Sequence, residues 1–330
     1  MKKAFLFTLL SFSGFYVSAQ TNLDSLYSVW QDKTQPDSSR ANSYYDYIHN
    51  GFVFNNPDTA VILAEKLMQF GTQHHYPIAN GNAYNLLGIS SSLRGNPSQG
   101  IDYFKQSLQV FEEIENIDKI ASAHNNLGLA YLKVGDLDVA LDYLQRALAR
   151  FEETGNIKNI TKCLHSISTV HRFQGEYLKA IEYLQRSVIV IEENGDKEGG
   201  SGASLEIAMM YRELDQNLKA LEIYEVCLKT FEEIGYKAGI ANVFNELGNI
   251  YSNQDENEKA LQYYERSVTI NEEIGDIKGV MIAKFNIGSM YLDLGETTKA
   301  LVSMNQTLDI CEKIGEKEGI AKSLAAIGRI

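Results

Sequence analysis

A segment of 40 residues recurs down most of this chain without any change of spacing. No insertion or deletion interrupts its register between Ala60 and Ile330. A fixed period of about 20 to 50 residues is typical of solenoids, in which each repeat packs mainly against its neighbours. The sequence therefore predicts a repeat array and not a globular domain with one central core. The most regular marker is an alanine, found as Ala140, Ala180, Ala220, Ala260 and Ala300.

Each repeat has the pattern of two helices. In the repeat 121–160 we expect a first helix from Ala121 to Lys133 and a second from Leu137 to Glu153. Gly135 and Gly155 follow these helices, and glycine readily adopts the left-handed conformation that ends a helix. The sequence thus predicts an all-α solenoid of antiparallel helix pairs, with seven repeats over residues 41–320, the first of them degenerate. The same glycine stop recurs at Gly195, Gly235, Gly275 and Gly315.

Six residues of this repeat resemble a known signature. They fall where the tetratricopeptide repeat places L-G-x-x-Y…A-x-x-x-F-x-x-A. The resemblance covers Gly81 to Ile330, and 41–80 more weakly, and it implies an α-α superhelix that binds proteins or peptides. This chain departs from the family in its period of 40 rather than about 34 residues, and in having Ser168 and Ala208 where glycine is expected. The six residues are Leu127, Gly128, Tyr131, Ala140, Leu144 and Ala147.

The N-terminus has the pattern of an export signal. Lys2 and Lys3 precede an apolar run, and Val17-Ser18-Ala19 offers the small residues that signal peptidase requires. The run is shorter than the roughly 20 residues of a membrane-spanning helix. We therefore expect residues 1–19 to be a cleaved signal peptide and the protein to be exported to the periplasm. An uncleaved anchor is the alternative. Residues 20–40 are expected to cap the open end of the array.

Charge and cysteine content exclude two classes of protein. The formal net charge of −13 repels phosphate backbones, so we expect no nucleic-acid partner. The odd number of cysteines does not form a disulfide framework. Cys163, Cys227 and Cys311 stand where other repeats place small or apolar residues, which predicts that they pack in the core.

No catalytic constellation is found, so we expect neither an enzyme nor a cofactor or metal site in this chain. The stretch 199–203 looks like a nucleophile elbow but lacks its last glycine and a preceding strand. His74 and His75 could bind a metal but have no further ligand in register, so an exposed turn is the simpler interpretation. A pair of glutamates recurs in five repeats, as at Glu152 and Glu153, which indicates a solvated face.

Binding residues are predicted from the resemblance. In tetratricopeptide superhelices the second, fifth, ninth and twelfth positions of each repeat face the concave surface, and we name these the groove positions. Basic side chains there would suit a carboxylate or an acidic peptide, and asparagine amides can bond to the backbone of an extended peptide. The alternative is a solvated surface on which any polar residue serves. The candidates are Asn85, Asn125, Lys162, His165, Arg172, Arg212, Asn242, Asn245 and Asn249.

Two kinds of function fit these features. Residues 321–330 begin another first helix without a second one, so we expect a fragment of a longer protein. A signal peptide followed by 40-residue repeats resembles the exported sensor regions of bacterial histidine kinases, whose membrane segment would lie beyond Ile330. A free periplasmic or secreted adaptor is the alternative, and the input region of a nucleotide cyclase or a helix-turn-helix regulator is a further one.

Overall fold

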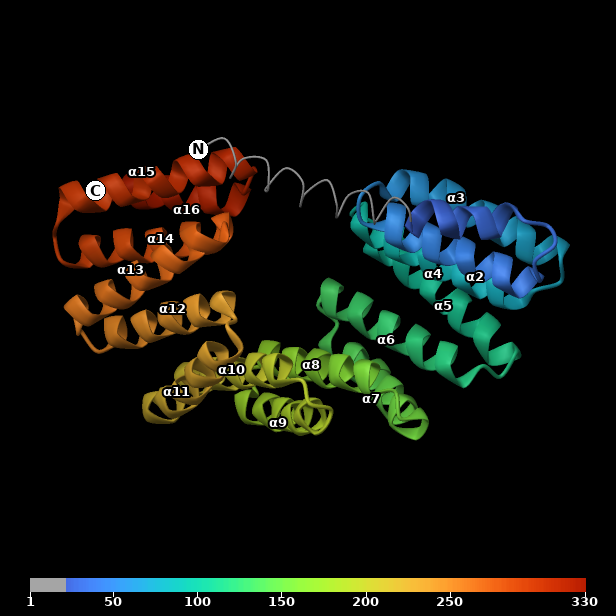
Figure 1. Cartoon of the computed structure of the whole chain (residues 1–330), viewed down its shortest axis with the longest axis horizontal. Helices are drawn as coiled ribbons and strands as arrows, with labels where there is room; N and C mark the ends of the chain where they lie inside the picture. Colours follow the sequence, from blue (N-terminus) through green and yellow to red (C-terminus); the bar gives the residue numbers. More distant parts are fainter. Residues whose placement is uncertain (1–21) are drawn as a thin grey trace. The chain divides into compact units, whose positions relative to one another are not determined.

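The computed structural model describes residues 22–330, and the predicted signal peptide lies outside them. No strand occurs in this range, and residues 22–31 form the first helical segment. The helices that follow (Figure 1) are α2 (Asp37–Ile48), the π-helix η1 (His49–Val53), α3 (Pro57–Gln73), α4 (Pro77–Leu93), α5 (Pro97–Glu113), α6 (Ile117–Val134), α7 (Leu137–Thr154), α8 (Ile157–Phe173), α9 (Tyr177–Glu193), α10 (Lys197–Glu213), α11 (Asn217–Ile234), α12 (Lys237–Asn253), α13 (Asn257–Ile274), α14 (Ile277–Asp293), α15 (Thr297–Ile314) and α16 (Lys317–Ile327).

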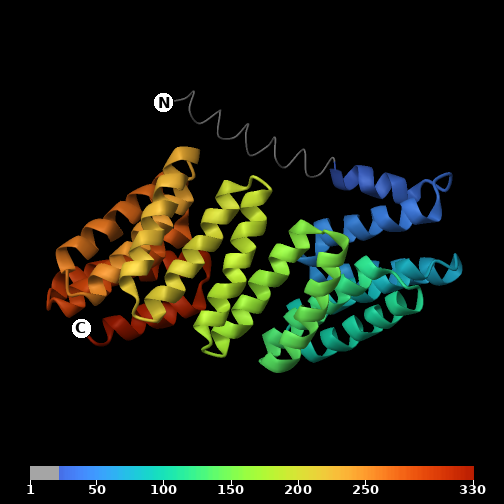
Figure 2. The ribbon, with the colours of Figure 1, turned by 90° about the horizontal axis from the view of Figure 1, so that it is seen from below.

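The helices pack in consecutive pairs within two compact units. The N-terminal unit ends at Gln174, and the C-terminal unit is Gly175–Ile330. In the first, α4 packs on α5 and α6 on α7; in the second, α10 packs on α11, α12 on α13 and α14 on α15. Figure 2 shows these helices side by side with short turns between them. The predicted all-α solenoid of helix pairs is confirmed.

The sequence located three of the four helix boundaries of the repeat 121–160 to within one residue. The predicted start of α6 at Ala121 is wrong, because the helix begins one turn earlier, at Ile117. The backbone N–H of Lys119 donates to Asn116 Oδ1 over 3.1 Å, and this cap satisfies an otherwise unpaired helix N–H. Helix α7 begins at Leu137, as predicted, and ends at Thr154, one residue beyond the predicted end.

The glycine stops adopt the left-handed conformation that the sequence predicted. Gly155 and Gly315 end α7 and α15 with φ values of 67° and 71°. The turn between α5 and α6 requires the same conformation but carries Glu115, whose φ is 54°. A left-handed conformation costs a residue with a Cβ atom about 1 to 2 kcal/mol. Glu115 is therefore a strained position within a regular series of glycines.

We expect Glu115→Gly to raise the free energy of unfolding by about 1 kcal/mol, because glycine adopts this conformation without steric cost. The side chain of Glu115 is exposed, so no packing is lost. Urea denaturation monitored by circular dichroism measures the effect. Gly155→Ala is the matched control and should lower the stability by a similar amount. A loss of stability in Glu115→Gly would contradict this account.

Close packing between the helices of a pair explains the small residue of the signature. A Cβ atom added at Gly128 would lie 2.6 Å from Leu144 Cγ, and one added at Gly248 would lie 2.5 Å from the ring of Tyr264. These side chains therefore rest directly on the glycine backbone. Ser168 and Ala208 occupy the same position in their repeats and are buried, as expected for the smallest substitutes.

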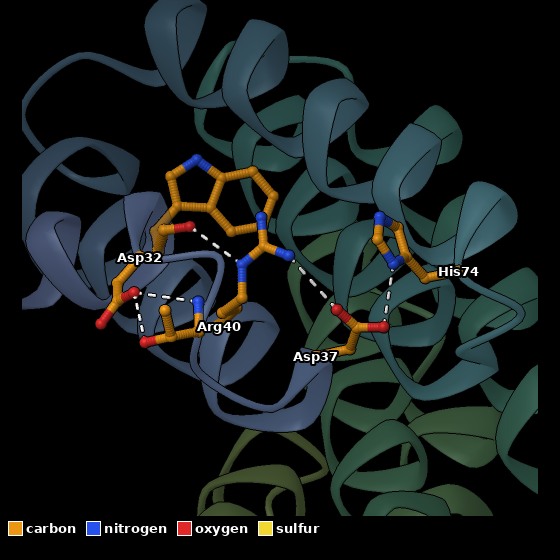
Figure 3. A network of polar contacts seen from close by, with 6 residues as sticks. Asp32, Asp37, Arg40 and His74 are labelled. Atoms are coloured by element: carbon orange, nitrogen blue, oxygen red, sulfur yellow. Dashed lines mark hydrogen bonds and ion pairs between the residues drawn. The ribbon is translucent and has the colours of Figure 1, made fainter.

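The lead-in is tied to the first repeat by a network of stacked and ionic groups (Figure 3). The guanidinium of Arg40 lies over the rings of Trp30 and Phe70, with its central carbon 5.5 Å and 4.8 Å from their centroids. Arg40 Nε donates to the carbonyl of Trp30 over 3.2 Å. Asp37 pairs with Arg40 at 3.2 Å and with His74 Nδ1 at 2.8 Å. These contacts hold the lead-in against α2 and α3, while its role as a cap stays a prediction.

The cysteines are core residues, as predicted. Cys163, Cys227 and Cys311 are free thiols and are buried. Burial raises the pKa of Cys163 to about 12 and that of Cys227 to about 11. The thiolate is the reactive form of cysteine, so burial favours the less reactive thiol form at Cys163 and Cys227.

Candidate binding groove

Groove positions of three successive first helices line one pocket in the C-terminal unit. The pocket has a volume of about 290 Å³. Leu205 and Met209 reach it from α10, Asn242 and Asn245 from α12, and Ile282 from α14. The structure thus brings two of the predicted asparagines together with three apolar side chains at groove positions.

A second pocket adjoins the first. Its volume is about 390 Å³, and Met281, Ile282 and Phe285 of α14 form much of its wall. Ile282 lines both pockets. The far wall is formed by α15 and α16, with Cys311 and Lys322 among the lining residues. The two pockets therefore continue along the same face of the C-terminal unit, from α10 to α16.

Glu246, which lines the first pocket, forms an ion pair with Arg212. Arg212 Nε lies 3.4 Å from Glu246 Oε2, although these two atoms do not form a hydrogen bond. The side chains of Arg212 and Glu246 are only 20% and 12% exposed. A second carboxylate, that of Glu213, lies 2.9 Å from Arg212 Nη2. The positive charge of Arg212 is thus balanced within the protein and is not available to a ligand in the way that the sequence suggested.

Burial determines the protonation behaviour of this cluster. Burial raises the pKa of Glu246, and the nearby Arg212 opposes that rise only in part. The phenol of Tyr264 is also affected, because burial and the neighbouring carboxylate of Glu246 raise its pKa to about 12. Glu246 is therefore a carboxylate kept in a poorly solvated position beside the pocket.

Two of the predicted asparagines already bond to neighbouring side chains. Tyr264 Oη donates to Asn249 Oδ1 over 2.8 Å. Asn286 Nδ2 donates to Asn245 Oδ1 over 3.0 Å, which links α14 to α12. Asn242, in contrast, is exposed at the mouth of the pocket. Of the three asparagines of α12 that were predicted to bind a peptide, Asn245 and Asn249 thus bond within the protein, and Asn242 is exposed.

The N-terminal unit uses its asparagines in the same structural way. Asn126 Nδ2 donates to Asn85 Oδ1 over 2.5 Å, and Asn85 Nδ2 donates to Tyr45 Oη over 3.2 Å. The thiol of Cys163 donates to Asn125 Oδ1 over 3.4 Å. Each of these bonds joins the first helices of successive repeats, which helps to keep the repeats in register.

The remaining candidates lie together on α8. Lys162, His165 and Arg172 are all exposed on this helix. The guanidinium carbon of Arg172 lies 5.2 Å from the centroid of the Phe173 ring. They belong to the N-terminal unit, whereas Arg212 belongs to the C-terminal one. The three residues of α8 and Arg212 of α10 each lie on the first helix of a repeat, as predicted. Peptide binding by these residues stays a prediction.

Sequence reasoning missed two important residues at the sixth position of the repeat. Glu246 lines the first pocket, and Asn286 bonds to the groove asparagine Asn245. The groove positions were taken from the family pattern, which does not include the sixth position. The only available signal was a charged residue placed between the fifth-position Asn245 and the buried Leu247.

A metal centre or a membrane-spanning helix would be a different kind of functional feature. Residues 22–330 contain no group of three metal-ligating His, Cys, Asp or Glu side chains. No helix in this range is long and apolar enough to cross a membrane. The repeated glutamates, such as Glu152 and Glu153, are exposed, which agrees with a solvated face.

Solved structures similar to this chain are arrays of helical repeats. A signal transduction ATPase with a tetratricopeptide repeat sensor, from Pyrococcus horikoshii, matches 92% of this chain and 48% of its own, with 16% identity and a TM-score of 0.63. Aspartyl phosphate phosphatase F from Bacillus subtilis matches 84% of this chain and 73% of its own, with 16% identity and a TM-score of 0.59. A Rap protein complexed with Competence and Sporulation Factor matches 94% and 97%, with 12% identity and a TM-score of 0.51. At such identities the likeness concerns the fold alone.

Sequence comparison identifies the repeats directly. No curated protein matches the sequence. The family model for the tetratricopeptide repeat matches residues 80–153, 119–193 and 200–273, which together make up more than half of the chain. These matches include α10 and α12, which carry the first pocket. The chain is a member of the tetratricopeptide repeat family.

Proposed function

We propose that this chain is a peptide-binding scaffold that forms the extracytoplasmic sensory region of a membrane-bound signalling protein of the sensor histidine kinase type. The observation that carries the binding role is the pair of adjoining pockets in the C-terminal unit, which groove positions of α10, α12 and α14 line. Pockets that bind specific ligands are mostly apolar and contain a few well-placed polar groups. Leu205, Met209 and Ile282 supply an apolar surface in the first pocket, and its polar lining residues are Asn242, Asn245, Glu246, Ser267 and Asn271.

Two similar structures support a sensory role. The Pyrococcus horikoshii protein contains a tetratricopeptide repeat sensor, and the Rap protein was solved with Competence and Sporulation Factor bound. In both cases an array with this fold is part of a protein that responds to a signal or binds a factor. A groove of stacked first helices in the present chain would work in the same general way, by binding a peptide and changing the spacing of its repeats.

The signal-peptide pattern of residues 1–19 supports export, which a membrane-bound sensor requires. A free periplasmic adaptor requires the same signal. A membrane-bound sensor would be found in the membrane fraction, whereas a free adaptor would be found in the soluble periplasmic fraction.

Cell fractionation tests this proposal. We expect the native protein to stay with the membrane fraction after a high-salt wash and to be released only by detergent. We also expect alkaline phosphatase fused after Ile330 to be active in a Gram-negative host, and to lose activity when residues 2–19 are deleted. This reporter needs the disulfides that form outside the cytoplasm. Recovery of the native protein in the soluble periplasmic fraction would favour the adaptor, and an inactive fusion would contradict export.

A further inference from the structure

The two adjoining pockets form the groove of the C-terminal unit. Their lining does not suit the acidic peptide that basic residues at groove positions had suggested. We propose that this groove binds an extended apolar peptide segment that contains no acidic residue, with two side chains of one face of the segment filling the two pockets. This inference rests on the proposed peptide-binding function and specifies its ligand.

Apolar side chains line much of the surface of the two pockets. At the fifth position of the repeat, the N-terminal unit has polar residues such as Asn85 and His165, whereas the C-terminal unit has Leu205 and Phe285 on either side of one polar residue, Asn245. Partly buried apolar side chains at the mouth of a pocket favour an apolar ligand, because binding removes both surfaces from water. The apolar residues that line the two pockets are Leu205, Met209, Met281, Ile282 and Phe285.

The charges around the two pockets disfavour an acidic ligand. Arg212 is balanced by Glu246 and Glu213, as described above. The second pocket is lined by Glu316 and Glu318, and its one basic residue, Lys322, pairs with Glu318 at 2.7 Å. An acidic side chain entering either pocket would therefore meet a carboxylate and no free cation among the lining residues. Like charges at short range disfavour binding.

The first pocket also has polar groups that suit the backbone of a peptide. Asn242 is exposed at the mouth of the first pocket and can both donate and accept. Glu246 Oε2 is buried beside the same pocket and has no hydrogen-bond donor. An extended peptide has a backbone N–H and a C=O at each residue, and its alternate side chains lie on one face. Such a segment can bond to Asn242 and place two apolar side chains into the pockets.

Selection from a random dodecapeptide library displayed on phage tests the inference, with the mature chain, residues 20–330, as the immobilised target. We expect the selected peptides to be enriched in pairs of apolar residues, and depleted of Asp and Glu relative to the unselected library. Ile282→Lys, at an exposed position shared by both pockets, should reduce phage recovery about tenfold or more. Val226→Lys on α11 is the matched control, because Val226 is also exposed and lines neither pocket, and it should bind as the wild type does.

Two results would distinguish a wrong class of peptide from the absence of peptide binding. Peptides rich in Asp and Glu, bound equally well by the wild type and by Ile282→Lys, would overturn the apolar assignment and leave peptide binding intact. A selection that recovers no peptide above the uncoated surface would overturn both. Circular dichroism of the two lysine variants confirms that each is folded before its binding is compared.

Discussion

Leu144→Ala is expected to lower the free energy of unfolding of the N-terminal unit by about 3 kcal/mol, as is typical of a large-to-small change in a core. Leu144 is fully buried, and its side chain rests on the backbone of Gly128 in the facing helix. The alanine variant would leave a cavity at the position where the two helices of the repeat approach most closely. Urea denaturation with hydrogen exchange on α6 and α7 measures the loss and shows where it occurs.

Leu218→Ala is the matched control for this experiment. Leu218 is 79% exposed on α11, so its truncation should change the stability by less than about 0.5 kcal/mol. Because each repeat contacts mainly its neighbours, the increase in exchange in Leu144→Ala should be greatest in α6 and α7. Equal losses in the two leucine variants would contradict the assignment of this helix contact as core packing.

Arg212→Met is expected to destabilise the C-terminal unit by about 2 kcal/mol. Breaking a buried ion pair leaves one charge without compensation, and the partial exposure of this pair lowers the expected loss. In the variant, the pKa of Glu246 should rise beyond the increase that burial already causes. A carboxyl group with a raised pKa binds more protons when folded than when unfolded, so its contribution to stability falls as the pH rises above its unfolded value. The deficit relative to the wild type should therefore be larger at about pH 8 than at about pH 5.

The double variant Arg212→Met/Glu246→Leu separates the ion pair from simple loss of packing. Apolar residues of similar volume often replace a buried ion pair at little cost, so the double variant should recover most of the stability and lose the pH dependence. Thermal or urea denaturation at the two pH values provides all the comparisons. A deficit in Arg212→Met that does not change with pH would contradict the placement of Glu246 beside this charge.

The fold could be predicted from the sequence because the same pattern of helices and glycine stops recurs in successive repeats. The glycine stops, such as Gly155 and Gly315, and the small residues opposite Leu144 and Tyr264 all proved to have the expected geometry. The start of α6 was less visible. The cap at Asn116 lies before the apolar pattern begins, and a short polar residue in a turn has several interpretations besides a cap.

The candidate site was only partly predictable, because periodicity shows which face a residue occupies and not what it bonds to. Asn245 and Asn249 were placed on the correct helix, but their oxygens accept hydrogen bonds from Asn286 and Tyr264. Arg212 was expected to present a free charge, but its partner Glu246 comes from the next repeat. The Asn286–Asn245 and Arg212–Glu246 pairs form between repeats, and the Tyr264–Asn249 bond forms between the two helices of one repeat, so all three depend on side-chain geometry that the repeat pattern does not reveal.

The most direct test of the proposed groove is a fluorescence anisotropy titration of one selected apolar peptide with the mature chain and with the variant Ile282→Lys. The structure predicts saturable binding to the wild type, about tenfold or greater weakening in Ile282→Lys, corresponding to about 1.4 kcal/mol or more, and unchanged binding in Val226→Lys. Equal affinity of all three proteins would place the peptide elsewhere on the molecule and would contradict a binding site in the pockets of the C-terminal unit.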